Sequence, residues 1–135
     1  MDLEALEKLK IAATKDLTLT DDNVLNKSLN LPILYQKYLD TFINQMKIMK
    51  KLERDKKMLY AKKYHYYKFE GEFKLDTKQE IETYINGDLE YDELLRKYNV
   101  QSVAITYLES VLDNIKKLTF TIKNYIEFKM FLAGK

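Results

Sequence analysis

The chain of 135 residues contains 33% charged and 46% hydrophobic residues, a balance typical of one folded domain and unlike that of a disordered chain. One proline, three glycines and no cysteine argue against an all-β fold with many tight turns, and exclude disulfides and thiol catalysis. The net charge of +2 is unevenly distributed, with about −2 over residues 1–46, +7 over 47–68, −7 over 69–95 and +4 over 96–135. A strongly basic segment is therefore followed directly by an acidic one.

The chain before Pro32 predicts a short N-terminal helix and a linker. Apolar residues recur at helical spacing from Leu3 to Ala13, which predicts an amphipathic helix of about three turns. The alternating residues 14–20 predict an extended link to a helix start at Asp21-Asp22-Asn23. Pro32 disfavours helical geometry in the residue before it and suits the first turn of a new helix.

Residues 32–69 predict one long helix of about ten turns, because they contain no glycine and no internal proline. Its apolar stripe consists of Tyr35, Tyr38, Leu39, Phe42, Met46, Met49, Leu52 and Leu59. Lys56 and Lys63 replace apolar residues in one heptad register, so the coiled-coil pattern fails where the positive charge increases.

Residues 70–87 predict an acidic connector that contains one short helix. Gly71 ends the long helix, Thr77-Lys78-Gln79-Glu80 matches a capping box, and Asn86-Gly87 matches a helix end. Within this helix we expect inward-facing side chains at Ile81, Tyr84 and Ile85.

Residues 88–135 predict a C-terminal helix capped by Asp88, with a helical apolar period over most of forty residues. Its apolar face is wider than one short partner helix can cover, which favours self-association through this helix. Packing against the helix at residues 32–69 is equally compatible with the pattern, and both can hold at once. The candidate oligomerisation residues are Ile105, Leu108, Leu112, Ile115, Ile122 and Ile126. The whole chain, residues 1–135, is expected to form a single helical domain, divided as residues 1–31, 32–69, 70–87 and 88–135.

The sequence predicts no catalytic site, metal site or cofactor. His65 is the only histidine, so triads and multi-histidine metal sites cannot be assembled within one chain. The Gly134-Lys135 pair has no helix after it and cannot form a phosphate-binding loop. No carboxylate pair stands out among the acidic residues of the connector, which we interpret as solvated surface or intersubunit contacts. We therefore expect a protein that is not an enzyme.

Residues 56–68 interleave lysines with aromatic residues, a pattern that suits single-stranded nucleic acid. On a helix, Lys56, Tyr60, Lys63 and Tyr67 follow at i, i+4, i+7 and i+11, while Lys50, Arg54 and Lys57 line a neighbouring face. Ammonium groups neutralise phosphates, and aromatic rings stack on bases that a duplex would hide. The alternative is a solvated basic face with tyrosines packed inward. The candidate DNA-binding residues are Lys56, Lys57, Tyr60, Lys62, Lys63, Tyr66, Tyr67 and Lys68.

Six segments carry a further signal through their order and spacing: Met1–Glu4, Leu25–Pro32, Leu34–Tyr38, the lysine-rich run ending in Tyr66-Tyr67, Ile115–Ile126 and Phe131–Lys135. In these segments the chain resembles, over essentially its whole length, the UvsY family of recombination mediators from T-even-like bacteriophages. Members of that family carry a Leu-Lys-Ala-Arg-like stretch before a Tyr-Tyr pair, associated with single-stranded DNA binding. Alignment on the pair puts Lys63 at the arginine position and Ala61 at the lysine position, so the resemblance makes Lys62 the expected substitute.

The resemblance implies an all-α protein that assembles through its C-terminal helix into a ring-like homo-oligomer of six or seven subunits. It implies that the protein binds single-stranded DNA, weakens the hold of the phage single-strand binding protein, and loads the phage RecA-like recombinase. These steps belong to homologous recombination and to recombination-dependent replication and repair.

The resemblance also implies a location in the cytoplasm of the host cell. No apolar run is long enough to cross a membrane, and Met1–Glu4 does not resemble the start of a signal peptide. The main alternative to the mediator function is an oligomeric coiled-coil scaffold or assembly protein, whose lysines serve only solvation and which has no specific role with nucleic acid.

Overall fold

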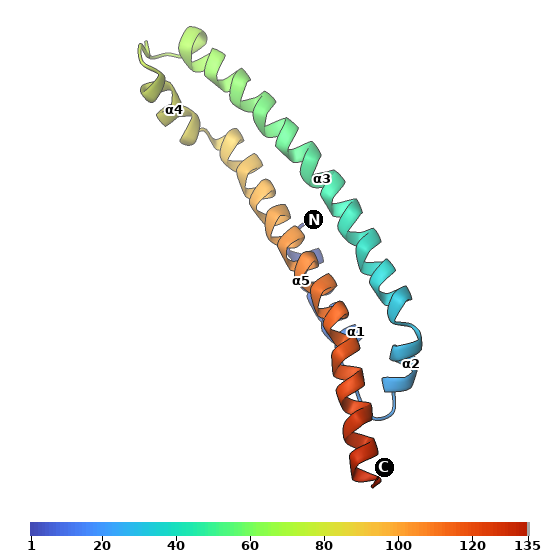
Figure 1. Ribbon diagram of the computed structural model, residues 1–135. Helices are drawn as coiled ribbons and strands as arrows, with labels where there is room; N and C mark the ends of the chain where they lie inside the picture. Colours follow the sequence, from blue (N-terminus) through green and yellow to red (C-terminus); the bar gives the residue numbers. More distant parts are fainter. Residues whose placement is uncertain (135) are drawn as a thin grey trace.

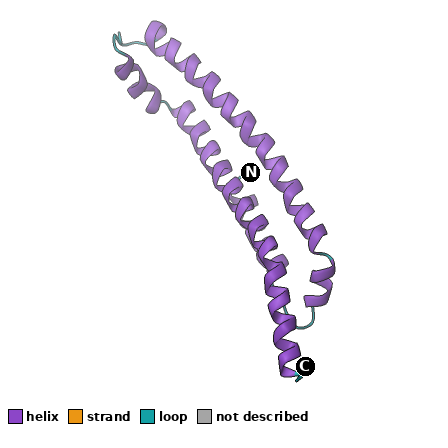
Figure 2. Ribbon diagram, in the orientation of Figure 1, coloured by secondary structure: helices purple, strands orange, loops and turns teal. Residues whose placement is uncertain are grey.

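The computed structural model describes residues 1–134, and every regular element in that range is helical. The predicted all-α fold class is therefore confirmed. In chain order the elements are α1 (Leu3–Leu17), α2 (Val24–Leu29), α3 (Leu31–His65), a π-helical turn η1 (Tyr66–Glu70), α4 (Lys78–Asn86) and α5 (Leu89–Leu132). Short loops join these helices into one elongated, gently curved molecule (Figure 2).

The two long helices, α3 and α5, run side by side in opposite directions and form the body of the molecule (Figure 1). Helix α4 lies at the end of this hairpin where α3 finishes, and α1 packs along the middle of α5. Helix α2 leads into α3 near the other end, where α5 finishes. The hairpin therefore has an α4 half, in which two long helices meet, and an α1 half, in which α1 is the third helix.

Two clusters of buried side chains form the core, one in each half. The α1 half contains Ala13, Tyr38, Leu108, Val111, Leu112 and Ile115, which are drawn from α1, α3 and α5. The α4 half contains Ile81, Ile85 and Tyr91, against which Leu59, Tyr60, Tyr64 and Tyr67 of α3 and η1 pack. Aliphatic side chains thus dominate the first cluster, and tyrosines surround the second.

The helix starts predicted around the acidic connector are confirmed. The Thr77 hydroxyl accepts from the backbone N–H of Glu80 at 3.2 Å, and the Asp88 carboxylate accepts from that of Tyr91 at 3.0 Å. The Glu80 carboxylate accepts from the backbone N–H of Asp76. Each cap satisfies backbone donors that the first helical turn leaves without partners.

Three local predictions were wrong. Helix α1 continues to Leu17, so residues 14–17 are helical and not extended. Leu31 is already part of α3 although Pro32 follows it, because this proline occupies the first turn, where its missing N–H costs no hydrogen bond. Tyr84 is partly exposed, whereas Ile81 and Ile85 are buried as expected.

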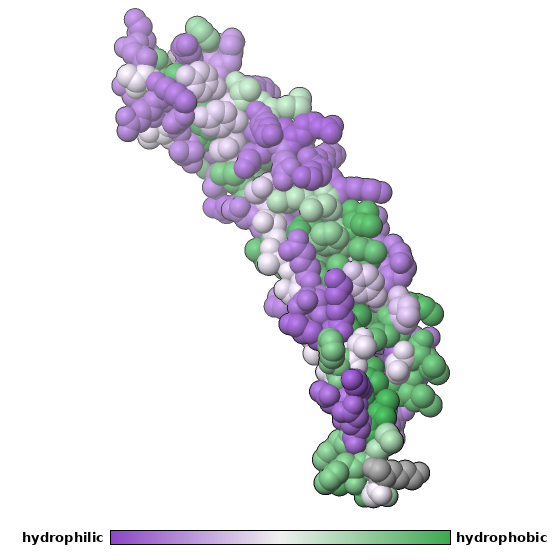
Figure 3. All heavy atoms as spheres, viewed as in Figure 1, coloured by the Kyte–Doolittle hydropathy of each residue, from purple (hydrophilic) through white to green (hydrophobic). Residues whose placement is uncertain are grey.

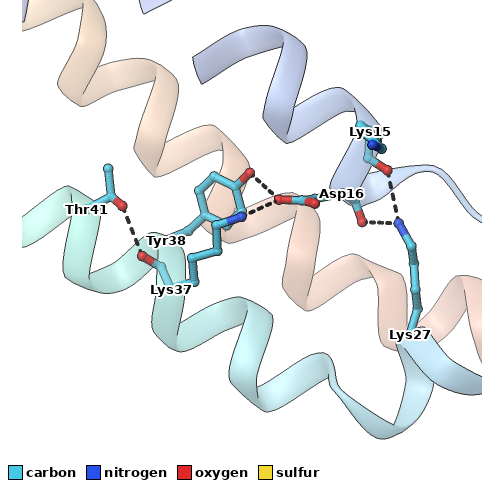
Figure 4. A network of polar contacts seen from close by, with 6 residues as sticks. All are labelled: Lys15, Asp16, Lys27, Lys37, Tyr38 and Thr41. Carbon is cyan, nitrogen blue, oxygen red and sulfur yellow. Dashed lines mark hydrogen bonds and ion pairs between the residues drawn. The ribbon is translucent and has the colours of Figure 1, made fainter. Parts of the chain in front are cut away.

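Figure 4 shows the polar contacts that hold the end of α1. The Asp16 carboxylate accepts from Lys37 Nζ at 2.8 Å and from the hydroxyl of buried Tyr38 at 2.7 Å. Lys27 Nζ donates to the backbone carbonyls of Lys15 and Asp16. Although partial burial opposes ionisation, the hydrogen bonds from Lys37 and Tyr38 lower the pKa of Asp16. These tertiary contacts explain why α1 is longer than its own periodicity predicts.

A polar pair lies between the long helices where the two halves meet. Gln101 is 0% exposed, and its side-chain amide donates to the backbone carbonyl of Gln45 at 2.8 Å and to the Gln45 side chain at 3.0 Å. The Met1 amino group donates to Gln101 Oε1 at 2.6 Å. Because a buried amide without partners is costly, this pair favours one register of α3 against α5.

Candidate nucleic-acid interface

One side of α3 and η1 presents a row of exposed cationic side chains, which we call the basic face. Its members are Lys47, Lys50, Lys51, Arg54, Lys57, Lys62 and Lys68. At about 3.6 residues per turn they share one side of the helix, and at about 1.5 Å per residue they extend over roughly 30 Å. Figure 3 shows mainly hydrophilic residues along this part of the molecule.

The stripe of Lys56, Tyr60, Lys63 and Tyr67 lies on the opposite side of α3, toward α4 and α5. Tyr60 and Tyr67 pack against the core of the α4 half, and the Tyr60 hydroxyl donates to Glu82 at 3.3 Å. Partial burial and the neighbouring Glu82 carboxylate raise the pKa of Tyr60. In the free chain these rings therefore contribute to packing, and their contact with DNA stays a prediction.

Lys63 is held by two carboxylates of the neighbouring helix. Its Nζ lies 3.2 Å from Asp88 Oδ2 and 2.8 Å from Glu90 Oε2, and its side chain is only 16% exposed. Asp88 also accepts from the Tyr67 hydroxyl at 2.6 Å while it caps α5. We call Lys63, Tyr67, Asp88 and Glu90 the Asp88 network. It fastens the end of α3 to the start of α5.

The ionisation of the Asp88 network follows from these contacts. The hydrogen bond to Glu90, supported by Asp88, raises the pKa of Lys63 and keeps it cationic. Although burial opposes ionisation, the hydrogen bonds from Tyr67, the Tyr91 backbone and Lys63 lower the pKa of Asp88. The hydrogen bond to Asp88, with burial, raises the pKa of Tyr67 to about 12.

Of the remaining predicted DNA-binding residues, one packs against α5 and four face the solvent. Lys56 Nζ lies 4.3 Å from the ring centroid of Tyr98 on α5, a cation–π contact. Lys57, Lys62, Tyr66 and Lys68 are exposed. The structure thus leaves four of the eight predicted residues accessible to a ligand.

The apolar residues of α3 could have identified the exposed side from the sequence. Met49 is buried, and Lys56 and Lys63 follow it at intervals of seven residues, on the same side of the helix. The neighbouring face noted from the sequence, with Lys50, Arg54 and Lys57, is the exposed one.

The candidate oligomerisation residues lie mostly inside the chain. Ile105, Leu108, Leu112, Ile115 and Ile122 are buried, and only Ile126 is exposed, at 50%. Exposed apolar residues occur along the whole molecule, and one group of them lies where α5 finishes, a region that we call the apolar end: Phe120, Ile126, Phe128, Met130, Phe131 and Leu132. Hydrophobic side chains cover this end of the molecule in Figure 3. The role of the candidate oligomerisation residues in assembly stays a prediction.

Two further features are absent from residues 1–134. No group of three histidine, aspartate or glutamate side chains there could hold a metal ion. Within the same range, none of the helices combines the length and the apolar character that crossing a bilayer requires.

Comparison with known proteins gives a consistent result. Residues 12–135 match the family model described as "Recombination, repair and ssDNA binding protein UvsY". Among curated proteins, the recombination protein uvsY of Enterobacteria phage T4 is 27% identical over 135 residues, covering 96% of this chain and 98% of that one.

Solved structures agree in fold over nearly the whole chain. A crystal structure of the bacteriophage T4 recombination mediator protein UvsY, in lattice type II, has a TM-score of 0.86 at 25% identity and covers 98% of both chains. The lattice type IV crystal structure of the same T4 protein has a TM-score of 0.84 at 22% identity, covering 93% of this chain and 97% of that one. The hairpin described above is therefore the fold of these structures.

Proposed function

This chain belongs to the UvsY family of recombination, repair and single-stranded-DNA-binding proteins, and from this premise we propose that it is a recombination mediator that holds single-stranded DNA on its basic face. The observation that carries the proposal is the row of exposed cations on α3 in a chain with a net charge of only +2. A concentration of positive charge on one helix attracts phosphates and releases their counterions.

Within this proposal, residues of the basic face bind the strand and the inward stripe supports them. Lys57, Lys62 and Lys68 are exposed and contact phosphates directly. Lys56, Tyr60, Lys63 and Tyr67 act indirectly, because their contacts with α4 and α5 hold the end of α3 in place. Lys62, beside Ala61, takes the role of the lysine that family members carry in this stretch.

We further propose that copies of the chain assemble into a ring-like homo-oligomer through the apolar end. A monomer would leave the large side chains of Phe128 and Phe131 in water, and a contact between copies would cover them. Several basic faces on one assembly bind one strand with much higher avidity than a single face. The ring thus gives a sequence-independent site its affinity.

The mediator role requires two protein partners, a RecA-like phage recombinase and the phage single-strand binding protein, and it operates in the cytoplasm of the host. The chain itself is not an enzyme in this proposal. Loading proceeds if the binding free energy that mediator and recombinase together gain on the strand exceeds the binding free energy that the single-strand binding protein loses when it leaves.

A salt titration of binding to oligo-dT tests the DNA site. The double variant Lys57→Ala, Lys62→Ala is expected to bind more weakly and to flatten the slope of log affinity against log salt by about 0.7 for each phosphate that is no longer neutralised. The matched control is Lys8→Ala, Lys10→Ala, which removes two exposed lysines from α1, away from the basic face. An equal slope in the folded Lys57 and Lys62 variant and in wild type would place the site elsewhere.

Light scattering tests assembly. The double variant Phe128→Glu, Phe131→Glu puts charges into the apolar end, so it is expected to give a smaller particle and weaker binding with an intact basic face. The control Ile11→Glu charges an exposed apolar side chain on α1, outside the basic face. A wild-type monomer at micromolar concentration would contradict the ring.

The scaffold alternative predicts a different result. A coiled-coil scaffold would keep its assembly but would bind oligo-dT no better than the Lys57 and Lys62 variant does. A recombinase ATPase assay on DNA coated by single-strand binding protein separates the two functions, because only a mediator restores activity.

A further inference from the structure

Six aromatic side chains gather at the end of the hairpin next to α4, and we call them the aromatic cluster: His65, Tyr66, Tyr67, Phe69, Phe73 and Tyr84. The ring centroids of His65 and Phe69 lie 4.9 Å apart, and those of Phe73 and Tyr84 lie 6.1 Å apart. Tyr67 lies 5.1 Å from Tyr66 and 5.7 Å from Tyr84, so Tyr66, Tyr67, Tyr84 and Phe73 form one connected group. His65 and Phe69 form a separate pair in the neighbouring turn.

Local backbone geometry brings these rings together. The turn η1 closes with a hydrogen bond from the Gly71 N–H to the Tyr66 carbonyl at 2.8 Å, five residues earlier. The loop after Gly71 then returns Phe73 to Tyr84 on α4. Between them lies an open hollow of about 300 Å³, lined mainly by Tyr66, Tyr67, Phe73 and Tyr84.

The outer rings of the aromatic cluster are not used by the core. Phe69 is 67% exposed and Phe73 is 62% exposed, and neither belongs to a buried cluster. Exposed large apolar side chains that lie close together mark interaction surfaces.

The basic face leads directly to these rings. Phe69 lies in η1 directly after Lys68, the last member of the basic face, and Lys68 Nζ lies 5.3 Å from its ring centroid. The exposed carboxylates of Glu70 and Glu72 adjoin the cluster and would repel phosphates. The rings therefore suit flat, uncharged groups. These groups would belong to a polyanion whose charged part is held on the neighbouring lysines.

We propose that Phe69 and Phe73, together with Tyr66 and Tyr84, form a base-stacking site for the nucleobases of a single strand whose phosphates lie on the basic face. This inference rests on the proposed function and assigns the two parts of the ligand to two different surfaces. Stacking on rings accepts every base, so the site adds affinity without reading sequence. It also discriminates against duplex DNA, in which the bases are not free to stack on protein.

Two ligands of equal length and charge test the site: oligo-dT and an abasic oligonucleotide with the same sugar–phosphate backbone. Wild type is expected to bind oligo-dT at least roughly tenfold more tightly than the abasic strand, because each stacked base contributes about that factor to the affinity. We call this the affinity ratio of the two ligands. The variant Phe69→Leu, Phe73→Leu keeps the sites apolar but removes the rings, so the ratio is expected to fall toward one with an unchanged salt slope. The control Phe69→Tyr, Phe73→Tyr keeps the rings and is expected to keep the ratio.

A second readout uses the absence of tryptophan from the sequence. Phe73→Trp introduces a single tryptophan at the hollow, which can be excited separately from the tyrosines, and its emission is expected to be quenched by oligo-dT but not by the abasic strand at equal occupancy. Equal quenching by both ligands would overturn the stacking site.

The outcomes separate this inference from the proposed function. Salt-dependent binding with no preference for bases in wild type, or a preference that survives in the Leu variant, overturns the stacking site and leaves the DNA-binding function intact. No salt-dependent binding at all overturns both. A Leu variant of lower mass in light scattering would show that the rings contact a second copy of the chain, which also overturns the site.

Discussion

The α1 half and the α4 half of the hairpin use the same two helices in different ways. In the α1 half, a third helix helps to bury aliphatic side chains such as Leu108 and Ile115. In the α4 half, two long helices meet, and their contact relies on tyrosines and on the Asp88 network. A helix with few partners keeps much of its circumference in solvent, so the α4 half can carry the basic face. The α1 half is therefore held together mainly by aliphatic burial, whereas the α4 half combines tyrosine packing and ion pairs with an exposed row of cations.

The largest expected effect concerns the aliphatic core of the α1 half. Leu108→Ala removes a fully buried side chain and is expected to lower the free energy of unfolding by about 3–4 kcal/mol, because apolar burial is reduced and a cavity is left behind. Urea denaturation at one fixed protein concentration measures it. The control Met58→Ala removes an exposed side chain in the α4 half and is expected to cost about 0.5 kcal/mol or less. Equal losses would contradict the division between halves.

The Asp88 network gives the next effect. Asp88→Ala removes the α5 cap and leaves Lys63 with Glu90 alone, so a loss of about 3 kcal/mol in unfolding free energy is expected. The control Asp2→Ala removes the exposed cap of α1, with an expected cost of about 1 kcal/mol.

A double variant tests whether Lys63 and Asp88 stabilise each other. Adding Lys63→Met to Asp88→Ala is expected to restore part of the stability, because no poorly paired cation then remains. Strictly additive losses in the double variant would show that Lys63 and Asp88 do not stabilise each other.

The smallest effect is a pH dependence specific to the α4 half. Because the folded-state pKa of Tyr67 is raised to about 12 from an ordinary 10, its hydrogen bond to Asp88 stabilises the fold fully below pH 10. That contribution is lost as the pH rises from 10 toward 12. Tyr67→Phe is expected to cost about 1 kcal/mol at neutral pH and to flatten the alkaline decline of stability.

Denaturant midpoints measured from pH 8 to pH 12 check this result. The matched control is Tyr66→Phe, which alters the exposed neighbour and is expected to follow the wild-type profile. A wild-type profile in Tyr67→Phe would show that the hydrogen bond contributes nothing.

Sequence reasoning succeeded where the signal is local. The caps at Thr77 and Asp88 depend on residues within one helical turn, so their spacing identifies them. The burial of Ile81 and Ile85 follows from short-range periodicity in the same way.

Sequence reasoning failed where residues far apart in the chain decide whether a side chain faces the interior or the solvent. Lys63 faces the interior only because Asp88 and Glu90, from another helix, compensate its charge. The inward position of Ile105 to Ile122 depends on which helices cover α5, and the apolar pattern is the same whether the cover comes from this chain or from another copy. The aromatic cluster was missed beyond Tyr66 and Tyr67, because Phe73 and Tyr84 meet through a loop whose course the pattern does not reveal.

The hairpin topology also sets the order in which contacts can form during folding. Lys63 and Asp88 are 25 residues apart in the chain, Gln45 and Gln101 are 56 apart, and Tyr35 and Lys116 are 81 apart. The entropy lost on closing a loop increases with its length, so the helices are expected to pair first at the α4 end and to zip toward α2. Helix α1 is synthesised first, yet it must wait for α5, which is synthesised last. The half that carries the basic face is therefore expected to fold earliest, and the helix that completes the other core is expected to dock last.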